Sequence, residues 1–252
     1  MRILVTNDDG IHARGLKVAE EIARALSDEV WVIAPETEQS GASHSLTLTV
    51  PLRVRAIAPR RFAVNGTPTD CVMMACLDLM KDAPPDLILS GVNSGSNIAE
   101  DVTYSGTIAA AMEGCALGIP SIALSQAHGP ERDEIDWSPG AVHAPALIRR
   151  LVETGWPDGT LLSVNFPDCA ADAVRGVEAV AQGERDRQSS KLVRRIDARG
   201  RPYFWLGYRR RMSDPPPGTD LKAIGQNKIC VTPLHMNLTE QKVLEKMRQS
   251  LG

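Results

Sequence analysis

The sequence opens with Met1-Arg2-Ile3-Leu4-Val5-Thr6-Asn7-Asp8-Asp9-Gly10, in which a short apolar run ends in a polar turn. Apolar residues at helical spacing come next: Leu16, Ala19, Ile22, Ala23 and Leu26. A second apolar run occupies residues 30–34, so the order predicts a strand, a helix and another strand. Neither strand alternates apolar with polar residues, which is typical of parallel strands covered by helices on both faces.

The same alternation continues to about residue 174. Apolar runs at 87–89, 122–124 and 161–164 predict further strands, and helical patterns lie at 72–80, 106–117 and 142–151. Thr69 is expected to cap the first of these helices. Alternating residues at 46–50 and 52–55 predict a hairpin beside the main sheet. Residues 1–174 are therefore expected to form a doubly wound, mostly parallel α/β core.

Residues 175–252 have a different texture, with short mixed strands, a basic stretch at 185–195 and a proline-rich loop at 215–218. The last segment, 239–251, spaces its apolar residues as an amphipathic helix does: Val243, Leu244, Met247 and Leu251. We expect an extended β-rich second domain that ends in this helix and serves oligomerisation by exchange between protomers. Packing of the helix on its own sheet is the equal alternative.

Composition and charge exclude several classes of function. A chain of 252 residues with 43% hydrophobic content can bury a large core, and 28 basic against 31 acidic residues give a net charge of -3. This charge creates no general field for a nucleic-acid polymer or an anionic membrane. Five scattered cysteines without a C-x-x-C pair, and the lack of a signal-peptide or membrane-spanning apolar run, predict a cytoplasmic protein.

Polar residues at the carboxyl ends of three segments predict a metal site, because ligands of open parallel sheets bind at that edge. The adjacent carboxylates of Asp8 and Asp9 repel each other unless a cation offsets them. With the hydroxyl of Ser40 and the amide oxygen of Asn93, they form an all-oxygen set suited to Mg²⁺, Mn²⁺ or Ca²⁺ rather than zinc. A lone Asp-Asp-Gly is more typical of a turn and helix cap, and this alternative stays open.

Tyr104-Ser105-Gly106-Thr107 precedes an alanine-rich helix, whose first backbone N–H groups form an anion site. Simple capping by Ser105 or Thr107 is the alternative. No histidine shows metal-ligand spacing. The chain also lacks G-x-S-x-G, Walker A and G-x-G-x-x-G motifs, which argues against an α/β-hydrolase, a P-loop enzyme or a dinucleotide enzyme.

As a set, these segments resemble the SurE family of survival-protein nucleotidases. The matching blocks are residues 3–13, 40–47, 65–72, 90–95, 101–107 and 109–114. The resemblance implies a Rossmann-like core, hydrolysis of nucleoside 5′- and 3′-monophosphates, and a homodimer or homotetramer. It implies one divalent ion per subunit, Mg²⁺ or Mn²⁺ with Ca²⁺ also able to bind, on Asp8, Asp9, Ser40 and Asn93. Its phosphate-side residues match Asn97, Ser105, Gly106 and Thr107.

Asp8 and Asp9 are the expected catalytic residues, and Asp8 is expected to orient or deprotonate the attacking water. Two departures from the family, Ala99 in place of a common glycine and Lys222 in place of an acidic residue, put substrate preference in doubt. A phosphoaspartate-forming phosphatase is an alternative, but its second aspartate stands two residues after the first. The non-enzyme alternative is a metal and nucleotide sensor that docks a partner through residues 185–195.

Overall fold

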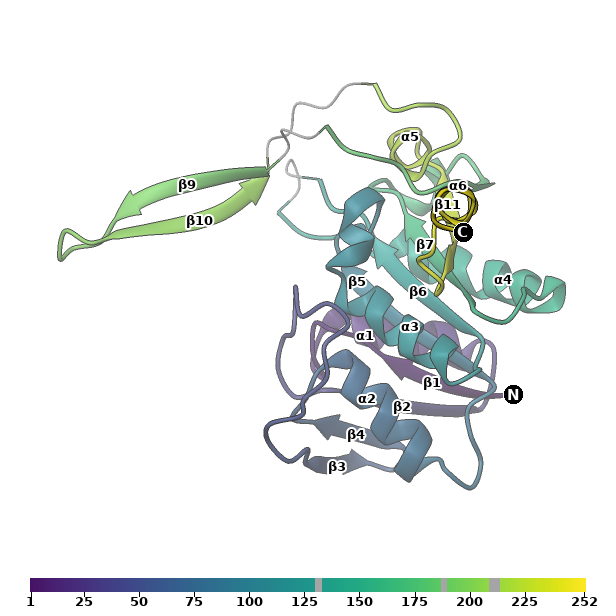
Figure 1. The fold of residues 1–252 in the computed structure, drawn as a ribbon. Helices are drawn as coiled ribbons and strands as arrows, with labels where there is room; N and C mark the ends of the chain where they lie inside the picture. The colour runs from purple at the N-terminus through teal and green to yellow at the C-terminus, as the bar shows by residue number, and fades with distance from the viewer. Residues whose placement is uncertain (130–132, 187–189, 209–213) are drawn as a thin grey trace.

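The computed structural model describes residues 1–129, 133–186, 190–208 and 214–252. Among these residues, nine strands form one sheet in the order β3-β4-β2-β1-β5-β6-β7-β11-β8 (Figure 1). Its strands are β1 Arg2–Thr6, β2 Glu29–Pro35, β3 Val54–Ala58, β4 Arg61–Val64, β5 Leu87–Ser94, β6 Ser121–Gln126, β7 Thr160–Phe166, β8 Val177–Ala179 and β11 Ile229–His235. Among the described strand pairs of this sheet, only β3–β4 and β7–β11 are antiparallel, so the expected mostly parallel α/β fold is confirmed.

Helices cover both faces of the sheet (Figure 1). On one face lie α1 Arg14–Arg24 and α4 Ser138–Thr154. On the other lie α3 Gly106–Ala116 and α2 Pro68–Met74, which continues into a π-helical turn at Ala75–Leu79. Shorter helical segments are Ala99–Thr103, Ala171–Ala173 and α5 Asp220–Gly225, and α6 Gln241–Leu251 ends the chain. No helix in the described ranges is long and apolar enough to cross a bilayer.

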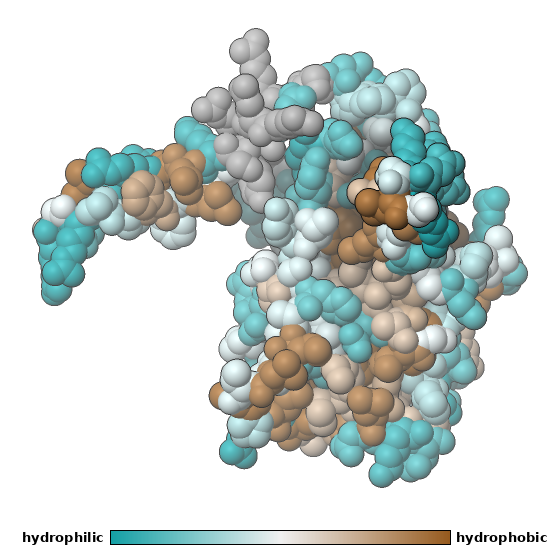
Figure 2. Space-filling model, in the orientation of Figure 1, coloured by the Kyte–Doolittle hydropathy of each residue, from teal (hydrophilic) through white to brown (hydrophobic). Residues whose placement is uncertain are grey.

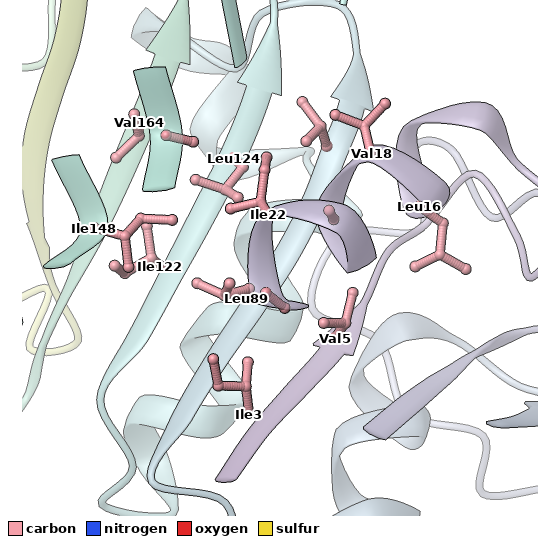
Figure 3. Close-up of a cluster of buried hydrophobic side chains, with 14 of the residues drawn as sticks. Ile3, Val5, Leu16, Val18, Ile22, Leu89, Ile122, Leu124, Ile148 and Val164 are labelled. Atoms are coloured by element: carbon pink, nitrogen blue, oxygen red, sulfur yellow. The ribbon is translucent and has the colours of Figure 1, made fainter. Parts of the chain in front are cut away.

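The continuous apolar strands are buried on both faces because successive side chains point to opposite sides of the sheet. Ile3 and Val5 of β1 pack toward α1, against Leu16 and Ile22 (Figure 3). Leu4, between them, belongs to the cluster under α2. All five are at most 1% exposed, and burying one such side chain contributes about 1.5–3 kcal/mol to stability. The first strand is thereby fixed at the centre, with its polar end at the carboxyl edge.

Two local expectations were wrong. The hairpin is β3–β4 and forms the edge of the main sheet. Residues 46–50 are not a strand, and Leu48 is 83% exposed. The cap of α2 is Thr67, not Thr69: Thr67 Oγ1 accepts from Asp70 N at 3.2 Å and Asp70 Oδ2 accepts from Thr67 N at 2.8 Å. This capping box, with Pro68 at the first helical position, places Thr69 inside the first turn.

The C-terminal part contributes both to the sheet and to a projecting arm. Strands β8 and β11 extend the main sheet past residue 174, while β9 Ser190–Ile196 and β10 Pro202–Tyr208 form a separate two-stranded arm (Figure 1). Figure 2 shows hydrophobic residues along this arm, where Trp205 is 64% and Leu206 70% exposed. Helix α6 buries none of its residues. Residues 187–189 of the basic stretch, and 209–213, lie outside the described residues, and the division into two domains stays a prediction.

Candidate active site

A pocket of about 240 Å³ opens at the carboxyl ends of β1 and β5, the edge where parallel sheets bind ligands. Most of its lining is polar. The lining residues are Asp8, Ser40, Gly41, Asn93, Ser94, Asn97, Asp101, Tyr104 and Ser105. The fold thus brings together five of the residues predicted from sequence, drawn from four separate segments of the chain.

Asp8 organises this pocket from the end of β1. Its side chain is only 4% exposed, and its Oδ1 accepts a 2.6 Å hydrogen bond from Thr107 Oγ1 at the start of α3. A Cβ on Gly106 would lie 2.7 Å from Asp8 Cβ, so this close approach of α3 requires glycine. The backbone oxygen of Asp8 also accepts from Gln39 N at 2.8 Å, which fixes the loop carrying Ser40.

Asp8 and Asp9 form an acidic pair without a cationic partner among the described ion pairs. Burial, and then the neighbouring Asp8 charge, raise the pKa of Asp9 to about 6, although Ser94 N donates to its Oδ2 at 3.2 Å. Burial also raises the pKa of Asp8, against the lowering effect of the Thr107 hydrogen bond. Such raised pKa values mark a place where the ionised pair needs a cation.

Ser40 and Asn93 present neutral oxygen donors to the same pocket. Ser40 Oγ donates to Glu38 Oε1 at 2.9 Å and keeps its lone pairs. Asn93 Nδ2 donates to Gly95 O at 2.9 Å, which leaves Oδ1 as the acceptor atom of that side chain. Two carboxylates, a hydroxyl and an amide oxygen suit a hard divalent cation. The described residues contain no group of three or more His, Cys, Asp or Glu that could hold a metal, so softer metal centres find no match there.

The predicted phosphate-side residues occupy different depths. Asn97 lines the pocket and is held by hydrogen bonds from its N to Asn165 Oδ1 at 2.8 Å and from its Nδ2 to Ser125 Oγ at 2.9 Å. Ser105 lines it too, yet its Oγ caps α3 by accepting from Ile108 N at 3.1 Å. Gly106 and Thr107 lie behind Asp8. Contact of these four residues with phosphate stays a prediction.

Sequence reasoning assigned no role to Ser94, Gly41, Asp101 and Tyr104, which also line the pocket. All four stand inside blocks quoted for the family resemblance, close to residues that were selected. Tyr104 is 62% exposed and is the one aromatic residue among the nine described residues of the lining. The signal available in the sequence was an aromatic residue, Tyr104, directly before a predicted helix cap, Ser105.

The whole chain matches known proteins. A family model described as survival protein SurE matches residues 3–189. A protein named 5'-nucleotidase SurE from Parvibaculum lavamentivorans is 56% identical over 253 residues, covering 100% of this chain and 91% of the relative. A protein of the same name from a Methylobacterium species is 57% identical over 253 residues, covering 100% of both. The crystal structure of the SurE protein from Aquifex aeolicus superimposes with a TM-score of 0.88 at 36% identity over 100% of both chains. This chain belongs to the SurE family.

Proposed function

We propose that this chain is a divalent-metal-dependent 5′-nucleotidase, a hydrolase that converts nucleoside 5′- and 3′-monophosphates to nucleoside and phosphate. The observation that carries the proposal is an acidic pair without a cationic partner among the described ion pairs: buried Asp8 lines a polar pocket of about 240 Å³, and half-buried Asp9 follows it in the chain. The names of the relatives, 5'-nucleotidase SurE, support the same activity.

The donor set fits one divalent ion per subunit. Asp8, Asp9, Ser40 and Asn93 would hold it, and Mg²⁺ or Mn²⁺ suits these hard oxygen donors best, with Ca²⁺ as a further ion that could bind. A divalent cation supplies a Lewis acid that offsets phosphate charge and makes water a better nucleophile. The raised pKa values of both aspartates support this assignment, because a bound cation would relieve the repulsion within the pair.

The chain's own residues would then position substrate and water. Asn97 and Ser105 line the pocket, and together with the first backbone N–H groups of α3, up to Thr107, they would hold the phosphate oxygens. Asp8 Oδ1 accepts from Thr107 Oγ1, and the Asp8 carboxylate has further lone pairs with which it would orient a water or accept its proton. Tyr104 stands at the exposed rim and offers a ring face for the base of a nucleotide.

Phosphate release from 5′-AMP, 3′-AMP and p-nitrophenyl phosphate tests the proposal. Purified protein should turn over all three with Mg²⁺ or Mn²⁺ and none in excess chelator. Binding of 5′-AMP without phosphate release would favour the sensor alternative. Phosphate retained covalently on acid-quenched protein would favour a phosphoaspartate instead.

The exposed arm and the unburied α6 support a homodimer or homotetramer in which C-terminal elements pack on a second copy of the chain. Burial of the arm's apolar residues needs a partner surface, and an identical protomer supplies one. The free thiols of Cys71, Cys76, Cys115 and Cys230 support a reducing cytoplasmic setting. Sizing by light scattering tests the assembly, since a monomer at micromolar concentration would exclude it.

A further inference from the structure

The loop from Asn97 to Tyr104 forms one wall of the pocket and supplies Asn97, Asp101 and Tyr104 to its lining. Its second turn contains Ala99, which has φ +52° and is fully buried. A Cβ makes this left-handed conformation unfavourable by about 1 kcal/mol, so a non-glycine residue keeps it only when its surroundings hold it there. The groups that hold Ala99 therefore help to set the shape of the pocket wall.

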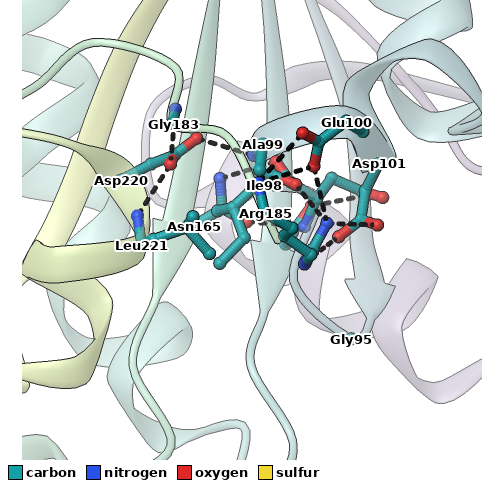
Figure 4. Close-up of polar contacts among 12 residues, drawn as sticks. Gly95, Ile98, Ala99, Glu100, Asp101, Asn165, Gly183, Arg185, Asp220 and Leu221 are labelled. Atoms are coloured by element: carbon teal, nitrogen blue, oxygen red, sulfur yellow. Dashed lines mark hydrogen bonds and ion pairs between the residues drawn. The ribbon is translucent and has the colours of Figure 1, made fainter. Parts of the chain in front are cut away.

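Both backbone groups of Ala99 are bound by the C-terminal part of the chain. Ala99 N donates to Asp220 Oδ2 at 2.9 Å (Figure 4). Ala99 O accepts from Gln182 Nε2 at 2.8 Å. Asp220 is 1% exposed, and its Oδ1 accepts from Gly183 N at 2.9 Å and Leu221 N at 2.7 Å. A Cβ on Gly183 would lie 2.8 Å from Asp220 Oδ1, so glycine permits this contact.

Arg185 binds the same loop at Asp101, two residues after Ala99. Its Nη1 and Nη2 donate to the two carboxylate oxygens of Asp101 at 2.8 and 2.5 Å, and Nη1 also donates to Ile98 O at 3.1 Å (Figure 4). Its backbone N donates to Glu100 Oε1 at 2.9 Å. A two-pronged guanidinium–carboxylate contact fixes geometry as well as charge. Without Arg185, the Asp101 carboxylate in the pocket lining would face an anionic substrate with its charge uncompensated.

We propose that Asp220 and Arg185 are positioning residues that hold the 97–104 loop in the conformation that receives the phosphate of the substrate. Arg185 also neutralises Asp101 on the pocket wall. Neither residue lines the pocket, so both act through the loop. The inference rests on the proposed phosphomonoesterase function. It assigns to the C-terminal part of the chain a direct role in the binding affinity of a site built on the N-terminal part.

The charge component is tested with Arg185→Met, Asp101→Asn and the double variant, using Mg²⁺-loaded protein and 5′-AMP. Arg185→Met should raise KM about tenfold and change kcat less than about twofold, because it leaves a carboxylate uncompensated beside the phosphate. Adding Asp101→Asn should return KM most of the way to the wild-type value. Lys228→Met is the matched control, since Lys228 forms a half-buried 2.7 Å ion pair with Glu178 outside the pocket. Arg185→Met with wild-type KM, or a double variant no better than the single, would overturn the charge role.

The conformational component is tested with Asp220→Asn, which replaces one carboxylate oxygen by an NH₂ group. The amide side chain can then no longer accept hydrogen bonds from all three backbone N–H groups of Ala99, Gly183 and Leu221. Hydrogen exchange should show the Ala99 amide losing protection, with KM rising in parallel. Adding Ala99→Gly, which removes the Cβ penalty at φ +52°, should recover part of the lost affinity. If Asp220→Asn does not fold, Gln182→Ala, which removes the donor to Ala99 O, replaces it.

Unchanged Ala99 exchange together with unchanged KM in these variants would overturn the positioning role. Wild-type protein that releases no phosphate would instead refute the proposed function. The Ala99 exchange measurement still reads the contacts of Asp220 in that case, so the two failures can be told apart.

Discussion

Asp8→Asn tests whether Asp8 holds a metal ion or only shapes a turn. Asparagine removes the charge but keeps the size of Asp8 and an acceptor oxygen for Thr107. Asp8 is 4% exposed, and at such a site little water replaces a lost charge interaction. If this charge stabilises the transition state by even about 3 kcal/mol through a bound cation, kcat should fall roughly a hundredfold or more. The fold should survive, since the 2.6 Å contact from Thr107 Oγ1 has an acceptor in both residues.

The assay compares phosphate release and thermal unfolding for wild type, Asp8→Asn and the exposed control Asp82→Asn. In excess chelator, Asp8→Asn should unfold at or above the wild-type temperature, because burial and, to a smaller extent, the charge of Glu38 penalise the ionised Asp8. Adding Mg²⁺ should raise the unfolding temperature of wild type and Asp82→Asn but hardly that of Asp8→Asn. Near-wild-type kcat in Asp8→Asn would return Asp8-Asp9-Gly10 to the status of a turn and refute the metal assignment.

Three further predictions use the same protein. Excess chelator should abolish phosphatase activity while circular dichroism stays unchanged, and Mg²⁺ or Mn²⁺ should restore it; full activity in chelator would refute metal dependence. The folded pKa of Asp9, about 6, lies above its ordinary 3.8, so metal-free protein should lose stability as pH rises through about 6, and Mg²⁺ should raise Tm more above pH 7 than at about pH 5; an equal rise at both would contradict this. Tyr104→Ala should raise KM several-fold for 5′-AMP but not for p-nitrophenyl phosphate, with Tyr104→Phe near wild type; equal losses on both substrates would exclude base contact.

The parallel core was predictable because burial leaves a local signature in each strand. Ile3, Leu4 and Val5 are all 0% exposed, and an uninterrupted apolar run of that kind fits a strand covered on both faces. The hairpin was misplaced because it was predicted from alternating apolar and polar residues, and exposed loops show the same alternation. Leu46, Leu48 and Val50 alternate with polar residues and yet are exposed in an irregular segment. Periodicity alone does not reveal which side chains find a packing partner.

The candidate site was partly predictable for a topological reason. Parallel strands bring their carboxyl ends to one edge, so Asp8 after β1 and Asn93 within β5 had to lie near each other. The role of Asp101 could not be inferred in this way, because its partner Arg185 is 84 residues away. In the sequence, Arg185 appears only as part of a basic stretch, and such stretches usually form a solvated surface. Contacts between the core and the C-terminal part depend on tertiary packing that no local pattern encodes.

Ala99 links the pocket to the C-terminal part of the chain. The family resemblance predicts glycine at this position of the chain, and the structure gives Ala99 φ +52°, the region where glycine carries no Cβ penalty. The substitution therefore keeps the loop conformation but makes it dependent on Asp220 and Gln182, which bind Ala99 N and O. A chain with glycine at this position should tolerate loss of the Asp220 carboxylate better than this one does. The affinity of the pocket and the packing of the C-terminal part are consequently more tightly linked here than the site residues alone would indicate.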